Sequence, residues 1–104
     1  MELTKDAQKL LSYIYQIYST RKKDGQPKDK AIEFMPNFYM ADNDLSQWDE
    51  SDIVYALIEL KDAGYIRCFT DGEFELQNAG IAMMENRFKK GVKEAWDVVS
   101  KFIP

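Results

Sequence analysis

The stretch that most constrains the fold is "LIELKDAGYIRCFTDGEFELQNAG", residues 57–80. An apolar, helix-periodic segment ends at Gly64, and two short strand-like segments then flank Asp71 and Gly72. A glycine directly after a helical period is typical of a helix end, and Asp-Gly between apolar segments is typical of a tight β-turn. The stretch therefore predicts a helix followed by a β-hairpin that runs from Tyr65 to Leu76.

The faces of this hairpin decide its register. A two-residue Asp-Gly turn would mix polar and apolar side chains on both faces. A three-residue loop, with Gly72 in the left-handed conformation, separates them. This register pairs Ile66 with Leu76 and Cys68 with Phe74 on one face, and Arg67 with Glu75 on the other. We therefore expect Cys68 to be a small buried residue and not a reactive thiol, with Phe69 outside near the tip.

The helix before the hairpin is predicted from "DESDIVYALIELKDAG". Ser51 is a suitable N-cap, Asp52 suits the first turn, and Gly64 suits the position after the last turn. Its expected buried stripe consists of Ile53, Val54, Leu57, Ile58 and Leu60.

A first helix is predicted to start after Thr4 as N-cap and to stop at Gly25. Its expected buried residues recur at helical spacing: Leu10, Leu11, Ile14, Ile17 and Tyr18. Arg21, Lys22 and Lys23 in the last turn suit the negative end of the helix dipole. Helix-end electrostatics is the simpler explanation for them, and a ligand patch is the alternative.

The segment from Gln26 to Trp48 gives no clear pattern. Pro27 could open a short helix through Glu33. Aromatic residues are dense here, at Phe34, Phe38, Tyr39 and Trp48. They fit either a core beneath a long connection or part of a partner surface, and we expect core.

The C-terminal part predicts an additional helix, which Gly91 weakens or kinks. Apolar residues recur at helical spacing both before and after this glycine: Ile81, Met84 and Phe88, then Val92, Ala95, Trp96, Val99 and Phe102 or Ile103. Together the segments predict one mainly helical α+β domain over residues 1–104.

Composition argues against an enzyme. The chain has no histidine and one cysteine, so a Cys/His zinc site cannot form and the commonest general base is missing. No Gly-rich phosphate loop or calcium loop occurs, and we expect no cofactor and no metal. Neither a signal peptide nor a run of 18 apolar residues is present, so the expected location is the cytoplasm, without membrane contact.

The segment from Ser51 to Met84 resembles the winged-helix domains of small bacterial regulators. Their motif "L-x-x-L-x-x-x-G-Y-I" matches Leu57, Leu60, Gly64, Tyr65 and Ile66, and "L-x-x-x-G" after the hairpin matches Leu76 and Gly80. The overall order is also similar to the prophage-associated YjcQ-like family. The resemblance implies a winged-helix fold whose hairpin is the wing, and a regulatory role. The long connection departs from a compact helix-turn-helix.

Charge is distributed unevenly along the chain. Residues 1–30 carry seven basic and four acidic side chains, whereas residues 41–76 carry ten acidic and two basic ones. The half that would read DNA is therefore acidic, and phosphate would repel it. The simplest explanation is a solvated helix face, and two functional explanations compete with it.

The first is protein binding. The candidate partner surface consists of Asp52, Tyr55, Glu59, Asp62, Phe69, Asp71 and Glu73. A homodimer through the terminal helices is a further expectation. The second is DNA binding through a basic patch, if the first and last helices lie side by side. That candidate patch consists of Arg21, Lys22, Lys23, Lys28, Lys30, Arg87, Lys89, Lys90 and Lys93.

Overall fold

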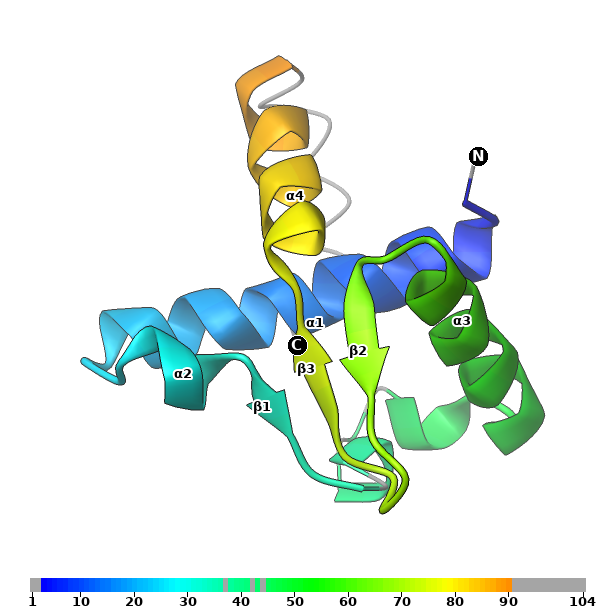
Figure 1. Cartoon of the computed structure of the whole chain (residues 1–104). Helices are drawn as coiled ribbons and strands as arrows, with labels where there is room; N and C mark the ends of the chain where they lie inside the picture. The colour runs from blue at the N-terminus through cyan, green and yellow to red at the C-terminus, as the bar shows by residue number, and fades with distance from the viewer. Residues whose placement is uncertain (1–2, 37, 42, 44, 91–104) are drawn as a thin grey trace.

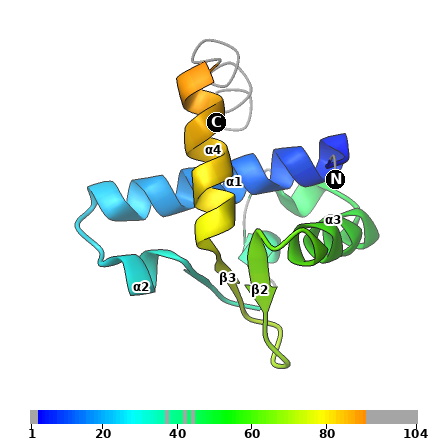
Figure 2. The ribbon, with the colours of Figure 1, turned by 45° about the horizontal axis from the view of Figure 1, so that its top comes forward.

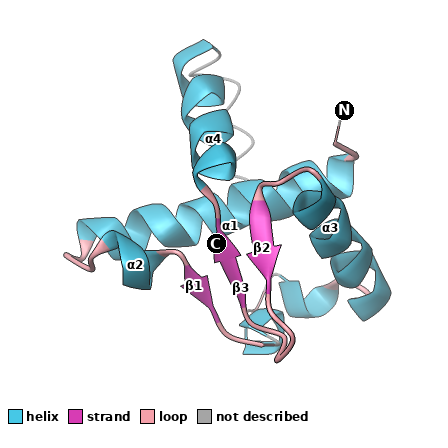
Figure 3. Cartoon of the chain, in the orientation of Figure 1, coloured by secondary structure: helices cyan, strands magenta, loops and turns pink. Residues whose placement is uncertain are grey.

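The structure is a computed structural model that describes residues 3–36, 38–41, 43 and 45–90. Within these residues, four α-helices accompany a three-stranded antiparallel sheet of order β1-β3-β2, which gives the expected α+β architecture (Figure 3). The helices are α1 (Lys5–Lys23), α2 (Lys28–Ala31), α3 (Glu50–Asp62) and α4 (Asn78–Lys90). The strands are β1 (Glu33–Phe34), β2 (Ile66–Cys68) and β3 (Phe74–Leu76), and two 3₁₀ turns lie at Phe38–Ala41 and Leu45–Gln47.

Helix α1 is the central element. It passes behind the sheet, α3 lies beside β2, and α4 rises from the end of β3 and crosses α1 (Figures 1 and 2). The hydroxyl oxygen of Thr4 accepts a hydrogen bond from the backbone N–H of Ala7, so the predicted N-cap is confirmed. Leu10, Leu11 and Ile14 are fully buried, whereas Ile17 and Tyr18 are partly buried.

The hairpin has the predicted register. Ile66 is opposite Leu76, Arg67 opposite Glu75, and Cys68 opposite Phe74. The loop closes with Phe69 N–H donating to the Glu73 carbonyl at 2.9 Å, and Gly72 has φ +93°. The expectation that Cys68 is buried was wrong, because its side chain is exposed. β2 is an edge strand, so sharing a face with Phe74 does not enclose this thiol.

Two predictions for α3 were wrong. The helix begins at Glu50 with Asp49 as N-cap, two residues before Ser51. Val54 and Ile58 are exposed, and the buried residues are Ile53, Ala56 and Leu60. The small Ala56 forms the contact face with Ile53 and Leu60, and this leaves the neighbouring apolar residues outside. Gly64 follows the helix with φ +82°, as expected.

The connection between α1 and α3 contains a strand that the sequence pattern did not predict. The short helix after Pro27 ends at Ala31 and not at Glu33, because Glu33 and Phe34 form β1 against β3. The Phe34 ring stacks on Phe74, with 4.8 Å between the ring centroids. Phe34 and Tyr39 are buried, and Phe38 and Trp48 pack against the core, so the aromatic residues are core residues as expected.

The first turn of helix α4 packs closely against the backbone that leads into β2. A Cβ atom on Gly80 would lie 2.7 Å from the carbonyl oxygen of Tyr65, so only glycine fits there without a shift. Ile81 and Met84 continue the core from this helix. The predicted stripe from Val92 to Phe102, and with it the proposed dimer contact, lies outside the described residues.

Candidate functional site

The outward side of α3 exposes an apolar patch. Tyr55 is 73% exposed, Ile58 43% and Val54 41%, although aliphatic and aromatic side chains are usually covered. Ser51 and Asp62 are exposed on the same side of the helix. We call these five residues the α3 face: Ser51, Val54, Tyr55, Ile58 and Asp62.

The periodicity of the helix explains this face. Ile53, Ala56 and Leu60 are buried, so the residues half a turn away point to solvent. Ser51, Tyr55, Ile58 and Asp62 follow one another at intervals of four, three and four residues. This spacing forms a seam along the helix of the kind through which two helices pack.

The acidic residues predicted for α3 have different environments. Asp52 is exposed, and Asp62 lies 3.8 Å from Lys61 in a surface ion pair. The Glu59 carboxylate instead accepts hydrogen bonds from the N–H of Thr4 at 2.6 Å and from its hydroxyl at 2.8 Å. Glu59 therefore joins α3 to the start of α1, and it is not available to a partner in the way that Asp52 and Asp62 are.

The remaining residues of the candidate partner surface lie at the tip of the hairpin. Asp71 and Phe69 are exposed, and the Asp71 carboxylate accepts a hydrogen bond from the N–H of Glu73 at 2.9 Å. The guanidinium of Arg67 lies 5.1 Å from the Phe69 ring centroid, which is a cation–π geometry. This Arg67 contact covers part of the Phe69 ring.

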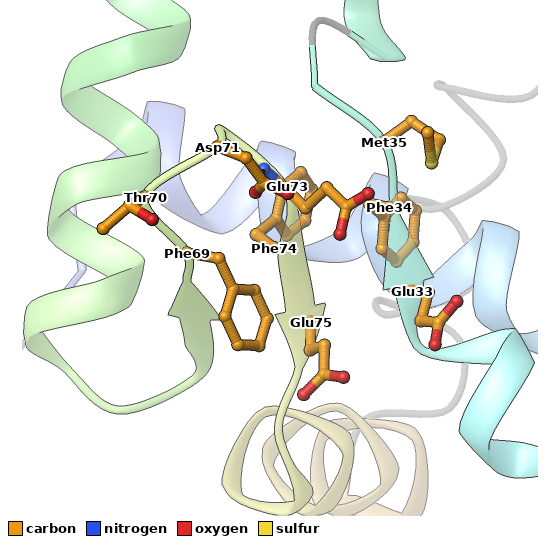
Figure 4. Close-up of a pocket in the computed structure, with 9 residues that line it drawn as sticks. All are labelled: Glu33, Phe34, Met35, Phe69, Thr70, Asp71, Glu73, Phe74 and Glu75. Carbon is orange, nitrogen blue, oxygen red and sulfur yellow. Dashed lines mark hydrogen bonds between the residues drawn. The ribbon is translucent and has the colours of Figure 1, made fainter.

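A groove of about 340 Å³ lies on the outer face of the sheet, between β1 and the hairpin (Figure 4). Glu33 is directly opposite Glu75, a like-charged pair that destabilises a sheet. Asp71 and Glu73 bring the carboxylates that line the groove to four. Phe69 and Met35 are its exposed apolar residues. Within the described part of the chain, no lysine or arginine nitrogen lies within 4.0 Å of these four carboxylates.

The basic candidates that the structure describes divide between the junction of α1 with α2 and helix α4. Lys22, Lys23, Lys28 and Lys30 are exposed where α1 ends and α2 follows. Helix α4 crosses α1 near its middle in both views and does not run beside its last turn (Figures 1 and 2). Arg87 is partly buried in α4, which also contains Lys89 and Lys90, and Lys93 lies outside the described residues.

The Arg21 side chain is engaged in contacts within the fold. Its Nη1 donates to the carbonyl oxygens of Ala31 and Glu33, at 3.2 and 2.5 Å, and its guanidinium lies 4.7 Å from the Phe34 ring centroid. Burial lowers the pKa of Arg21, and the carboxylate of Glu33 opposes that shift. Lys28 is also engaged, because its Nζ donates to the Asn78 side-chain oxygen at 2.7 Å.

Metal-ligating side chains do not gather into a site among the described residues. No three Cys, Asp or Glu side chains there are placed to hold a metal ion. None of the described helices combines the length and the apolar character needed to cross a membrane.

Comparison with known proteins adds no relative. No family model matches the chain, and searches of curated proteins and of solved structures give no match either.

Proposed function

We propose that this chain is a non-catalytic winged-helix protein of regulatory or phage-associated type that acts mainly through protein contacts. The order of elements supports the fold, because α3 is followed by a two-stranded hairpin and β1 completes a small sheet. In this proposal α3 occupies the position of the recognition helix and the hairpin is the wing.

The observation that carries the proposal is the exposed apolar surface of the α3 face, made by Val54, Tyr55 and Ile58. A helix that docks on DNA needs basic side chains around it to hold phosphates. Here Lys61 is the one basic residue of α3, and it is paired with Asp62. Exposed aromatic and aliphatic residues at the centre of a surface are instead typical of protein interfaces.

Site-specific photo-crosslinking tests the proposal. Tyr55 is replaced by benzoylphenylalanine in cells, and Lys30, exposed on α2, is replaced in the control. We expect protein adducts at position 55 that disappear with Ile58→Asp and are missing at position 30. Equal adducts at both positions, or none at position 55, would overturn the proposal.

DNA binding is the second candidate, supported by the exposed lysines at the α1–α2 junction: Lys22, Lys23, Lys28 and Lys30. A fluorescence titration with random duplex DNA at low salt separates the two functions, because phosphate contacts strengthen as salt is removed. We expect no saturable binding. Tight binding that Lys22→Glu combined with Lys30→Glu abolishes would favour DNA.

A further inference from the structure

We infer that the occupant of the α3 face is a basic amphipathic helix of a partner protein. The inference rests on the proposed function and adds the chemistry of the partner. Three properties of the described surface carry it: the exposed apolar side chains, their spacing and the charge around them.

The apolar centre requires an apolar counterpart. Val54, Tyr55 and Ile58 are three of the six large hydrophobic side chains that the described residues expose, and they adjoin one another on one helix. Covering them with leucine- or isoleucine-sized side chains removes apolar surface from water on both partners, which favours association.

The spacing favours a helix as the counterpart. The α3 face runs along a helix of 13 residues, or roughly 20 Å. Its four-three-four seam offers side chains at the intervals that interlock with a second helix. An extended partner peptide would pair with free backbone N–H and C=O groups. Along α3 these groups are hydrogen-bonded within the helix.

The charge around the face selects a basic partner. Asp52 and Asp62 are exposed on α3, and the hairpin beside the helix adds Asp71 and Glu73. The groove carboxylates Glu33 and Glu75 extend the same sign across the sheet (Figure 4). Lysine or arginine side chains on the edges of the partner helix would complement this field and speed its association.

A second copy of this chain fits less well. The basic residues at the α1–α2 junction have the right sign, but the described residues of these two helices expose no large hydrophobic side chain. Polynucleotides are disfavoured as well, because their phosphates would meet the same carboxylates.

The test uses the full chain and a synthetic, fluorescein-labelled helical peptide. The peptide has about 18 residues, because isolated helices shorter than ~12–15 residues are marginal in water. It carries leucines at three- and four-residue intervals and lysines on both flanks. A matched peptide has glutamates in place of the lysines, and fluorescence anisotropy measures both affinities.

We expect the lysine peptide to bind and the glutamate peptide not to bind at concentrations up to ~100 µM, a weak-interaction range. Tyr55→Ala and Ile58→Asp should each weaken binding by about tenfold or more, as truncation of an interface centre does. Ala82→Asp is the control, since Ala82 is exposed on α4, and none of the proposed contacts involves that helix. Circular dichroism verifies that each variant is folded.

Exchanging the charges completes the test. Asp52→Lys with Asp62→Lys should reverse the preference in favour of the glutamate peptide. The inference would be overturned if Ile58→Asp left the affinity unchanged, if both peptides bound equally well, or if neither peptide bound. So would self-association, seen by sedimentation, that Ile58→Asp abolishes. Crosslinks at position 55 without peptide binding would refute this inference alone and leave the proposed function standing.

Discussion

The Glu59 carboxylate accepts two hydrogen bonds from Thr4, one from its backbone N–H at 2.6 Å and one from its hydroxyl at 2.8 Å. Thr4 in turn caps α1 by accepting from the N–H of Ala7. A single acidic residue of α3 therefore fixes the N-terminus of the helix against which α3 packs. Negative charge at this end also complements the dipole of α1.

Glu59→Ala should lower the free energy of unfolding by about 1–3 kcal/mol, because it removes two charge-assisted hydrogen bonds. Urea unfolding followed by circular dichroism measures the change. Asp62→Ala is the matched control from the same helix. We expect it to cost at most about 0.5 kcal/mol, since its contact with Lys61 is an exposed ion pair. Equal costs for the two variants would contradict the role given to Glu59.

Gly80→Ala should destabilise the protein by about 1–3 kcal/mol, although alanine normally improves a helix. The added Cβ would lie 2.7 Å from the Tyr65 carbonyl oxygen and 3.1 Å from the Leu76 side chain. The control is Ala82→Gly at an exposed site in the same helix, which should cost about 1 kcal/mol through helix propensity alone. Thermal unfolding compares them, and a stabilised Gly80→Ala variant would refute the close contact.

Arg21→Lys should cost about 1–2 kcal/mol in urea unfolding, because an ammonium cannot reproduce the planar fork of a guanidinium. Two carbonyl oxygens and the Phe34 ring would lose their shared partner. Lys22→Ala, one residue along and exposed, should change stability by less than about 0.5 kcal/mol. If Arg21→Lys left the free energy of unfolding unchanged, the Arg21 side chain would lie in solvent and these contacts would not stabilise the fold.

The Cys68 thiol should react slowly at neutral pH despite its exposure. Desolvation by its surroundings raises the pKa of this thiol, and the positive charge of Lys61 opposes the rise. The thiolate is the reactive form, so a raised pKa leaves less of it at pH 7 than in a free cysteine derivative. Reaction with Ellman's reagent should accelerate as pH rises beyond the free-thiol pKa. Lys61→Ala should slow it further at pH 8, and a faster Lys61→Ala variant would contradict the assignment.

The sequence predicts the elements that local chemistry determines. Thr4 caps α1, Gly64 ends α3, and the hairpin register follows because burial of one face allows only one pairing around Gly72. These features depend on residues close together in the chain, where periodicity and turn preferences act directly.

Features that depend on distant contacts were missed. A two-residue strand such as β1 is too short to show an alternating pattern, and only β3 makes it a strand. Glu59 looks like any surface acid, since its partner Thr4 is 55 residues away. Val54 and Ile58 resemble core residues, because apolar character alone cannot tell a helix face that packs inside from one left open.

The Arg21 guanidinium lies against β1, an edge strand of the sheet. A strand at the border of a sheet leaves a row of backbone groups that a foreign strand can pair with. On β1 the outward carbonyl of Glu33 already accepts from the Arg21 guanidinium, and on the opposite border α3 lies against β2. These contacts hinder strand addition at both borders of this small sheet, the pairing through which edge-to-edge aggregation begins.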